Sequence, residues 1–552
     1  MDPARLEGPG KPFGLSSLMP ASNRLTAREY AFLGLGLLFW AGFVILLGKD
    51  TSWDFRNYHW YAPYALLNHR MAIDVAVAHQ ASYYNPYLDI PFYWLATHTR
   101  AWIALGVLGA AQGANMVPLY LMARASLRVD APASDIKIMA GALSLLGVVG
   151  ALTLTEFGTT YYDNVMSVFV LSGLAVLVLK RDVLREGPLG KVAGISAAAG
   201  LVTGMAMGLK LPEMPFCVGF AAALIALGGS WKHQLVRLLA GGLAGIAGFL
   251  IFSGPWMLYM YQLTANPLFP YFNDYWKSPL ALPVSYRDLR FVPAFRPWWQ
   301  QLFFPVLFTI DWHVADDLGF QDIRVMLAYL LVIATAVLWL FRRESRDPLL
   351  DKRVTGVLFV FFALSYLQWL RTFAIYRYII LYEMLAPLLI IGAVGLLPLP
   401  RRSRYLALGG LCAACLLTAR SDFLERAPVE DPYVEVALPP IPHPGKTMVV
   451  MTGDAPMGFI ATTLPPQIPV LRIDGWMVQP RDGTRLTKDM MRRVAAHINA
   501  GGDLYLIADS GDMNRAHNAL ADYHLAIRWP ECQQFDTNLV GTYQWCPLAR
   551  KS

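Results

Sequence analysis

The sequence predicts a mainly helical, polytopic membrane protein of about eleven transmembrane helices, with a small carboxyl-terminal α/β domain outside the membrane. Of its 552 residues, 56% are hydrophobic and only 15% are charged. Soluble proteins average about 45–50% apolar and about 25% charged residues, so this chain carries more apolar surface than a soluble core can hold. Several apolar runs also reach the roughly 17–25 residues that a helix needs to cross a bilayer. This composition excludes disordered, collagen-like and coiled-coil proteins.

The predicted transmembrane domain extends over residues 30–420 and is preceded by a polar tail, residues 1–29, that is rich in Pro and Gly. The tail lacks the short apolar core and small-residue cleavage site of a signal peptide, so we expect it to be retained. The predicted helices lie near 30–48, 101–123, 137–154, 165–179, 192–209, 213–229, 238–259, 323–341, 354–373, 379–398 and 405–419.

The distribution of basic residues predicts the orientation, because basic loops stay on the cytoplasmic side. With the amino terminus inside, 21 of the 46 Lys and Arg residues lie in the cytoplasmic tail and short cytoplasmic loops. The net charge of +7 is then mostly a signal of topology, and we do not expect nucleic acid as a partner. An odd number of helices places the carboxyl terminus outside.

Three long segments fall on that outer side: 49–100, 260–322 and 421–552. The first two are rich in Trp, Tyr, Phe and Pro, which is typical of interfacial helices and loops. The third alternates strand-like runs with one helical stretch that Gly501 and Gly502 end. The strand-like runs are Thr447–Thr452, Pro469–Ile473 and Asp503–Ala508, and the helical stretch is Lys488–Asn499.

The five cysteines fit this arrangement. Cys217, Cys412 and Cys415 lie in predicted membrane helices, where cysteine packs as a small apolar residue. Cys532 and Cys546 are the only cysteines after the last helix, and they bracket two strand-like runs joined by a tight turn. An oxidising compartment would allow this pair to form a disulfide.

The first candidate functional residue is Asp54, which directly follows the first membrane helix, with Arg56 and His59 close by. Ionisable groups near the ends of membrane helices are costly and are functional candidates by default. At this position Asp54 could accept a proton from an attacking hydroxyl. It could equally cap a helix or pair with Arg56, and the sequence leaves these alternatives open.

A second acidic motif lies where the third predicted helix ends and contains Glu156 and Asp163. Asp163 could cap the fourth helix, since aspartate is favoured at that position, whereas Glu156 has less structural reason to be there. Two acidic sites on separate outer loops could meet at one cavity, where they would position a hydroxyl or bind a divalent cation. The sequence does not establish whether a metal is used.

The third candidate is an outer-side segment with Arg371, Arg377 and Tyr378. Arginine offers a planar fork of donors that suits phosphate oxygens, and a lipid-linked phosphate would explain basic residues in this place. The alternative is an internal ion pair between Arg377 and Glu383.

Two further residues join the candidate site. Lys210, between the fifth and sixth predicted helices, raises the same question as Arg377: an anionic ligand or an internal ion pair. Asn266 opens a Pro-rich and aromatic outer loop that could line a substrate groove. No Walker P-loop, Rossmann glycine fingerprint or HExxH motif is present in the sequence, which disfavours ATP-driven transport and nucleotide-sugar chemistry.

The order of these features resembles the GT-C superfamily of polytopic glycosyltransferases, which take sugars from polyprenyl-phosphate carriers. The closest similarity is to bacterial glycosyltransferase-87-like membrane proteins, and it covers roughly residues 30–400. It rests on Asp54-Phe55-Arg56-Asn57-Tyr58-His59, Tyr84-Asn85-Pro86-Tyr87-Leu88-Asp89, Asn266-Pro267-Leu268-Phe269-Pro270 and Arg377-Tyr378. In that superfamily the early outer-loop aspartate is the catalytic base, and the matching residue here is Asp54. Phe55 replaces the second acid of the commoner Asp-Glu pair, which places metal binding at this position in doubt.

The resemblance implies an inverting glycosyltransferase at the periplasmic face of a bacterial inner membrane, with its amino terminus in the cytoplasm and its carboxyl terminus in the periplasm. Its partners would be a polyprenyl-phosphate-linked sugar donor, a glycan or lipid acceptor, and the bilayer. Asp54 would act as the base, and Glu156 or Asp163 would orient hydroxyls. The residues expected to contact substrate are Arg56, His59, Lys210, Asn266, Arg371, Arg377 and Tyr378. The alternative is a non-enzymatic transporter of lipid-linked glycans or an assembly subunit.

Overall fold

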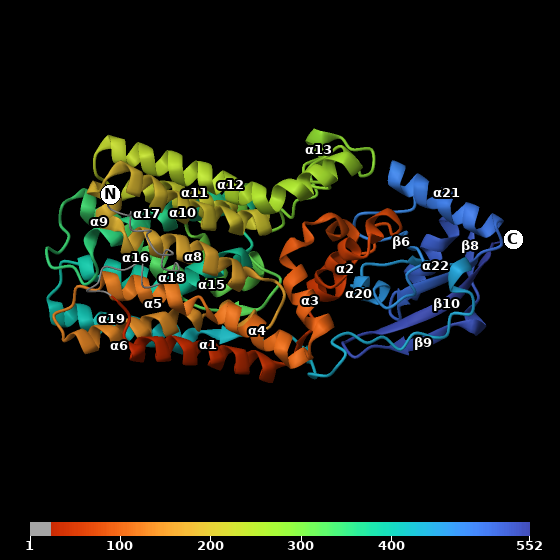
Figure 1. Cartoon of the computed structure of the whole chain (residues 1–552), viewed down its shortest axis with the longest axis horizontal. Helices are drawn as coiled ribbons and strands as arrows, with labels where there is room; N and C mark the ends of the chain where they lie inside the picture. The colour runs from red at the N-terminus through yellow and green to blue at the C-terminus, as the bar shows by residue number, and fades with distance from the viewer. Residues whose placement is uncertain (1–23, 552) are drawn as a thin grey trace, which may run out of the picture.

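The computed structural model describes residues 24–551 and is elongated, with a bundle of helices at one end and a mixed sheet at the other (Figure 1). Most of the predicted tail, residues 1–23, lies outside the described residues. The main helices of the bundle are α1 (Ala27–Leu47), α4 (Ala101–Gly113), α5 (Met116–Ser126), α6 (Ala133–Val148), α8 (Asp163–Leu179), α10 (Leu189–Leu209), α11 (Met214–Ala226), α12 (Trp231–Thr264), α16 (Arg324–Leu340), α17 (Lys352–Thr372), α18 (Ile380–Leu396) and α19 (Arg401–Thr418).

Six helical segments within residues 24–551 are long and apolar enough to cross a membrane, so the prediction of about eleven spans is confirmed only in part. The six are Ala27–Leu47, Ala101–Ser126, Leu189–Leu209, Trp231–Thr264, Lys352–Thr372 and Tyr376–Leu396. Three other predicted spans are shorter apolar helices, namely Asp163–Leu179, Leu211–Ala226 and Arg324–Leu340. The predicted span 137–154 is divided between α6 and the short helix α7 (Ala151–Thr155). In α19 the arginines of the first turn lower the mean hydropathy.

Helix α12 is the longest helix described, with 34 residues. At a rise of 1.5 Å per residue it measures about 50 Å, whereas the hydrocarbon core of a bilayer is about 30 Å thick. It packs against α10 through facing glycines, and a side chain on Gly200 or Gly204 would collide with the backbone of Gly241 or Gly245. Small residues at this spacing let two membrane helices approach closely. The protruding end of α12 leads into the second outer segment and α13 (Asn273–Trp276).

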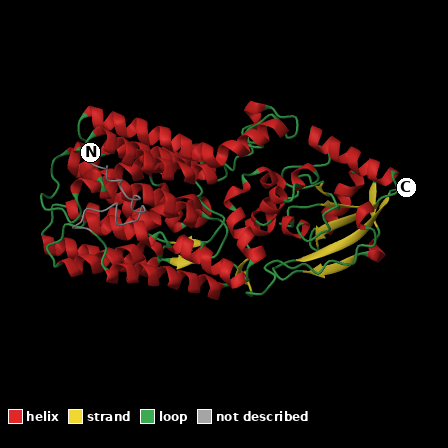
Figure 2. Ribbon diagram, in the orientation of Figure 1, coloured by secondary structure: helices red, strands yellow, loops and turns green. Residues whose placement is uncertain are grey.

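The carboxyl-terminal region is a mixed six-stranded sheet with helices packed on it (Figure 2). The strand order is β6-β5-β7-β10-β8, and β9 pairs with β10; β5, β6 and β7 are parallel, and the others are antiparallel. The elements are β5 (Thr447–Met451), α20 (Gly458–Ala461), β6 (Val470–Arg472), α21 (Arg485–Asn499), β7 (Asp503–Asp509), α22 (Met513–Asp522), β8 (Leu525–Ile527), β9 (Gln533–Asp536) and β10 (Thr542–Arg550). The three predicted strands and the predicted helix are confirmed to within about three residues at their ends.

The first outer segment is interlocked with this sheet. Val75 extends the sheet beyond β6, because its N–H donates to the Val470 carbonyl at 2.9 Å and its carbonyl accepts from Arg472 at 3.0 Å. A side chain on Gly458 in α20 would collide with the Asn57 carbonyl. Strand β1 (Lys49–Asp50) pairs antiparallel with β4 (Arg426–Ala427). The carboxyl-terminal domain therefore fixes the position of the segment that carries Asp54.

The predicted disulfide is confirmed, since Cys532 and Cys546 are bonded to each other across a sequence separation of 14. Cys546 lies in β10, and Cys532 immediately precedes β9, the strand that pairs with β10. Cys217, Cys412 and Cys415 are free and lie in helices, as the sequence predicts.

We expect thiol labelling of the denatured, unreduced protein to find three free cysteines, and labelling after reduction to find five. In the chain-entropy model a closed loop of this length contributes about 3 kcal/mol to the free energy of unfolding. Cys546→Ser should therefore lower the melting temperature of the carboxyl-terminal domain, whereas Cys412→Ser should leave it unchanged. Five free cysteines without reduction would contradict the pairing.

Candidate functional site

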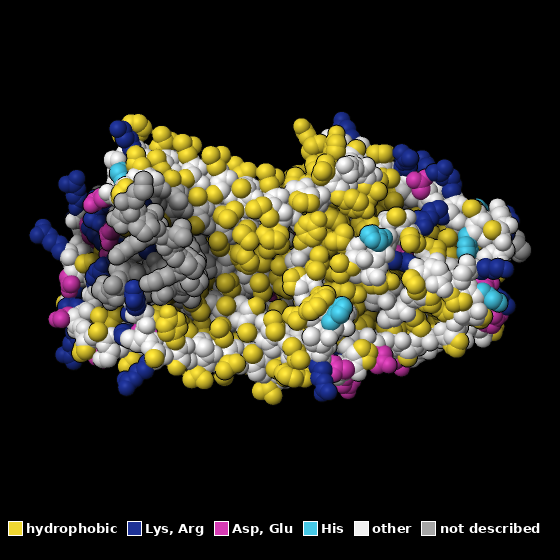
Figure 3. All heavy atoms as spheres, viewed as in Figure 1, with side chains coloured by type: hydrophobic (Ala, Val, Ile, Leu, Met, Phe, Trp, Pro, Cys, Tyr) yellow, Lys and Arg dark blue, Asp and Glu magenta, His cyan; other side chains and the backbone are white. Residues whose placement is uncertain are grey.

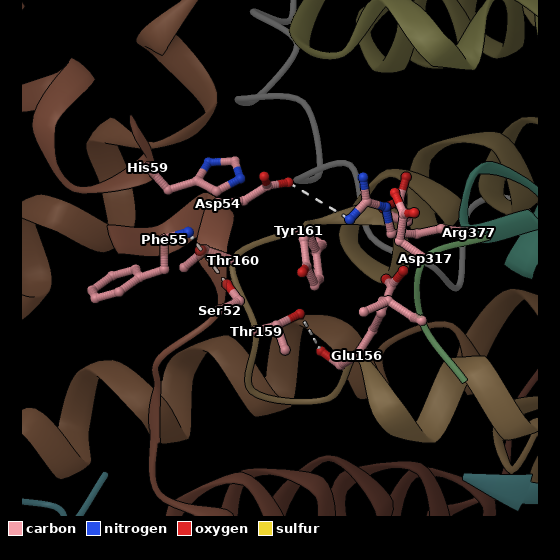
Figure 4. A network of polar contacts seen from close by, with 12 residues as sticks. Ser52, Asp54, Phe55, His59, Glu156, Thr159, Thr160, Tyr161, Asp317 and Arg377 are labelled. Carbon is pink, nitrogen blue, oxygen red and sulfur yellow. Dashed lines mark hydrogen bonds and ion pairs between the residues drawn. The ribbon is translucent and has the colours of Figure 1, made fainter. Parts of the chain in front are cut away.

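Four of the charged residues singled out in the sequence lie together, where the bundle meets the outer segments. Asp54 precedes the π-helical turn η3 (Phe55–His59), and Asp163 begins α8. Lys210 follows α10, and Arg377 lies in the 3-10 turn η10 (Tyr376–Ile379) that leads into α18. Figure 4 shows Asp54 and Arg377 facing each other, with Tyr161 and Glu156 close by. We call Asp54, Asp163, Lys210 and Arg377 the charge cluster.

Arg377 is the centre of the charge cluster. One terminal nitrogen of its guanidinium is 3.6 Å from Asp54 Oδ2, and Nε is 3.9 Å from Asp163 Oδ2. The guanidinium carbon lies 4.1 Å from the centre of the Tyr161 ring, a distance at which a cation is attracted to the ring face. Within residues 24–551 the guanidinium donates no hydrogen bond, and Nε is buried without a partner. Its donors therefore remain available to an anionic ligand.

Lys210 neutralises Asp163. Its ammonium group donates to Asp163 Oδ1 at 2.5 Å and to the Tyr161 carbonyl at 2.8 Å, and Asp163 is buried. Asp163 follows Tyr162, which has a positive φ of 65°. This conformation is costly for an aromatic residue and is found mainly where the surrounding structure enforces it. The cap at the start of α8 is Tyr162, so the simple capping role for Asp163 is wrong.

Asp54 makes neither of the structural contacts that would explain it locally. Its side chain makes no cap hydrogen bond at η3, and Arg56 instead donates to the carbonyls of Thr51 and Val540 at 3.0 and 3.1 Å. Asp54 Oδ2 accepts from the Tyr58 hydroxyl at 3.2 Å, and 18% of the Asp54 side chain is exposed. Both alternatives for Asp54, the cap and the Arg56 pair, are therefore wrong.

The predicted alternative for Arg377, an ion pair with Glu383, is also wrong. Glu383 accepts hydrogen bonds from the backbone of Leu152, from the backbone and hydroxyl of Thr153, and from the Tyr376 hydroxyl. A side chain on Gly150 would collide with the Glu383 carboxylate, so the chain between α6 and α7 closes directly over it. Glu383 thus links α18 to α7 through hydrogen bonds and does not pair with Arg377.

Glu156 is fully buried, and neither of its carboxylate oxygens has a hydrogen-bond partner in the described part of the chain. Burial raises its pKa well above the ordinary value, and the negative charge of Asp163 raises it further; Lys210 and Arg377 act in the opposite direction. This environment therefore favours the neutral, protonated form of the carboxyl.

The acidic residues do not fit a divalent cation. Residues 24–551 contain no group of three or more His, Cys, Asp or Glu side chains arranged to hold a metal ion. Asp54 and Asp163 face Arg377 and Lys210 instead, and these two cations already occupy the space between the carboxylates.

A cavity of about 140 Å³ adjoins the charge cluster. Its wall includes Lys210, His59, Tyr378 and the outer loop after Asn266. His59 Nδ1 lies 2.6 Å from Asp89 Oδ1, and His59 Nε2 is buried without a partner. Further tyrosines line the cavity, namely Tyr58, Tyr83, Tyr84, Tyr161 and Tyr271. Such a wall combines aromatic faces with hydroxyls, as in sites that take small polar ligands.

Three predicted contact residues, Arg56, Arg371 and Asn266, lie neither in the charge cluster nor in the wall of the cavity. Arg56 binds backbone carbonyls, and Arg371 is exposed at the end of α17. Asn266 is buried and organises its own loop, because its amide donates to the Tyr271 carbonyl at 3.0 Å and accepts from Leu268 N–H at 2.9 Å. Its contribution is to shape the loop that lines the cavity.

Sequence reasoning missed Asp316, whose carboxylate accepts a 2.6 Å hydrogen bond from the Arg377 backbone N–H. Burial raises the pKa of Asp316 to about 6, although the charge of Arg377 opposes the shift. Its only sequence signal is an acidic residue in the second outer segment, and this segment contains several others.

Comparisons of the chain with protein-family models, with curated proteins and with solved structures found no match. The geometry of the site therefore carries the functional argument.

The state of Glu156 predicts a pH dependence of stability. Its raised pKa means that the native protein keeps a proton which the unfolded chain releases, so the free energy of unfolding should fall as pH rises from 5 to 8. One such proton contributes up to about 1.4 kcal/mol per pH unit. Glu156→Gln should remove this contribution in melting curves measured across that range. Glu425→Gln, at an exposed position, is the control, and identical slopes for wild type and Glu156→Gln would contradict the assignment.

Proposed function

We propose that the chain is a membrane glycosyltransferase similar to the GT-C superfamily, which transfers a sugar from a polyprenyl-phosphate carrier to an acceptor hydroxyl. The observation that carries this proposal is Arg377. Its guanidinium makes no hydrogen bonds to the described residues and lies 3.6 Å from the carboxylate of Asp54, and both side chains are partly exposed, at 17% and 18%. A phosphate-binding cation and a potential base thus adjoin each other beside a cavity.

The proposed orientation places the charge cluster at the periplasmic face of a bacterial inner membrane. In Figure 3, Lys and Arg side chains crowd the end of the bundle opposite the carboxyl-terminal domain, and a band of hydrophobic side chains lies between. Exposed basic residues near that end include Arg342, Arg343, Lys352, Arg353 and Arg402. Under the positive-inside rule this end is cytoplasmic. We further propose that shorter helices such as α8, α11 and α16 complete the set of spans.

In the proposed reaction, Asp54 removes the proton of an acceptor hydroxyl. The acceptor oxygen then bonds to the anomeric carbon of the sugar, the bond from that carbon to the phosphate oxygen breaks, and the lipid phosphate leaves on the opposite face. This single displacement inverts the anomeric configuration. No nucleotide is needed, which agrees with the absence of nucleotide-binding motifs from the sequence.

Arg377 and Lys210 would hold the departing phosphate. Arginine binds phosphate through two parallel hydrogen bonds, which are stronger than neutral ones. In the structure the guanidinium faces Asp54 at 3.6 Å, so a phosphate that recruits Arg377 would draw it away from the carboxylate. Asp54 would then be a better proton acceptor. Donor binding would in this way increase the basicity of the Asp54 carboxylate.

We expect Asp54→Asn to reduce transfer by about 10²–10⁴-fold, the usual cost of losing a general base, with little effect on folding. Asparagine has nearly the same shape and can still accept from the Tyr58 hydroxyl. Transfer from a radiolabelled polyprenyl-phosphate sugar in proteoliposomes measures the effect. Asp274→Asn, at an exposed acid of the second outer segment, is the matched control. Wild-type turnover in Asp54→Asn would refute the base, and donor binding without any transfer by the wild type would favour the transporter.

Arg377→Ala should weaken binding of a polyprenyl phosphate by at least tenfold, and more than it slows transfer at saturating donor. The exposed Arg420→Ala is the comparison, because it removes an arginine that lies outside the charge cluster, just after α19. Binding can be measured from the ligand-induced rise in melting temperature in detergent. If Arg377→Ala keeps its donor affinity and only loses stability, the guanidinium is a structural ion-pair partner of Asp54 and Asp163.

A further inference from the structure

A second set of residues with ligand-binding chemistry lies at the carboxyl ends of the parallel strands. The strand order β6-β5-β7 places the loops after all three strands at one edge of the sheet. In open α/β sheets ligands bind at this edge, near the point where the strand order reverses. Here the first outer segment, which carries Asp54, packs against the same edge.

Two indole rings from separate parts of the chain stack at this edge. Trp53, the neighbour of Asp54, and Trp476, in the loop after β6, have ring centres 4.8 Å apart and planes inclined by 12°. The ring of His79 lies 5.9 Å from Trp476 and 6.1 Å from Trp53. Trp476 is 56% exposed, so its ring is open to a ligand. We call Trp53 and Trp476 the indole platform, beside which His79 is buried.

A polar group borders the loop that carries Trp476. Arg515, in α22, donates to Asp474 Oδ2 and Asp454 Oδ2, each at 2.6 Å, and 38% of its side chain is exposed. Asp454 follows β5 and has 36% of its side chain exposed, so its carboxylate keeps acceptor capacity beyond the bonds from Arg515. Two carboxylates on the loops after β5 and β6, and the guanidinium of α22 that binds them, thus border the loop of Trp476.

His79 is the unexplained group beside this edge. It is 1% exposed, and neither of its ring nitrogens makes a hydrogen bond of normal geometry with a described residue. Burial and the charge of Arg472 lower the pKa of His79 well below its usual value. The nearby backbone of Asp454 acts in the opposite direction. His79 also has a positive φ of 54°, and a side chain on Gly475 would collide with its ring. A neutral imidazole is therefore held against the loop that carries Trp476.

We propose that the indole platform and the Asp454–Arg515 pair bind an uncharged pyranose ring of the glycan that accepts the sugar. The face of a pyranose that carries C–H bonds stacks on the negative face of an indole, and a carboxylate and a guanidinium at its rim can bind adjacent hydroxyls. The two carboxylates disfavour an anionic ligand such as nucleic acid, and the polar rim disfavours a lipid tail. That this glycan is an acceptor rests on the proposed function, whereas the binding itself does not.

Trp53 and Asp54 are consecutive residues, so they connect the indole platform with the charge cluster. Consecutive residues in a helical turn point about 100° apart, so Trp53 faces the carboxyl-terminal domain while Asp54 faces Arg377. A glycan chain seated on the indole platform would thereby be directed toward the base. Such a glycan would extend beyond the cavity next to the charge cluster, because this cavity has a volume of only about 140 Å³.

The test is binding of soluble oligosaccharides to the full-length protein in detergent, measured by tryptophan fluorescence and calorimetry. The probes are hexasaccharides of β-1,4-glucose, α-1,4-glucose, β-1,4-N-acetylglucosamine and α-1,6-mannose. We expect at least one probe to bind, Trp476→Ala to weaken it at least tenfold, and Asp454→Asn to weaken it several-fold. Trp529→Ala removes another exposed tryptophan of the same domain, 50% exposed, and should change nothing.

Two results would overturn the inference: equal binding by wild type and Trp476→Ala, or no binding of any probe by the wild type. An intact disulfide and an unchanged melting temperature would show that Trp476→Ala is folded. Asp54→Asn should bind the oligosaccharide as the wild type does. If the wild type binds the oligosaccharide but transfers no sugar from a polyprenyl-phosphate donor, the proposed function fails while the indole platform stands. If transfer is observed and only the Trp476 result fails, the indole platform fails while the proposed function stands.

Discussion

The position of one guanidinium determines how the site can work. Arg377 lies between two carboxylates from distant parts of the chain, Asp54 at 3.6 Å and Asp163 at 3.9 Å, and it rests on the face of Tyr161. A buried charge is stable only when it is paired or solvated. These contacts are too long to be hydrogen bonds, so they balance the charge while its donors stay unused. A charge held in this way is suited to an exchange of partners, which a tightly hydrogen-bonded ion pair would resist.

For this exchange, Asp54 must stay in place when Arg377 turns to another anion. The carboxyl-terminal domain holds the segment that carries Asp54 in position. Asn57, one turn after Asp54, packs so closely on Gly458 that no side chain fits there. Val75, farther along the same segment, extends the edge of the sheet beside β6. The bundle supplies Asp163, Lys210 and Arg377, whereas the outer segment supplies Asp54 and depends on the domain for its shape. The domain therefore belongs to the site, although none of the charge cluster lies in it.

Much of this arrangement was predictable from the sequence. The apolar runs located the helices, strand-like runs located β5, β6 and β7, and charges at the ends of helices indicated Asp54, Asp163, Lys210 and Arg377. The number of spans is confirmed only in part, and apolar composition did not reveal where a helix is interrupted, as at Gly150 between α6 and α7. The Arg377–Glu383 pairing was wrong because neighbours in sequence need not face each other: Glu383 points to α7, and η10 turns Arg377 away from it. Asp316 had no pattern that distinguished it from other outer-loop acids.

The two polar sites differ in a way that fits two kinds of ligand. In the charge cluster Asp163 is buried and the other three side chains are 16–18% exposed. The cluster places cations among carboxylates beside a cavity lined by tyrosines, so an anion that enters gains interactions that are screened less than in water. Trp476 of the indole platform is exposed, and the neighbouring Arg515 is already hydrogen-bonded to two carboxylates. This site therefore offers aromatic faces and acceptors with little net attraction for charge. In the proposed reaction the anionic donor would bind at the charge cluster and the neutral acceptor at the indole platform. Because Trp53 and Asp54 are adjacent residues of one helical turn, the two sites meet at the carboxylate that would receive the proton.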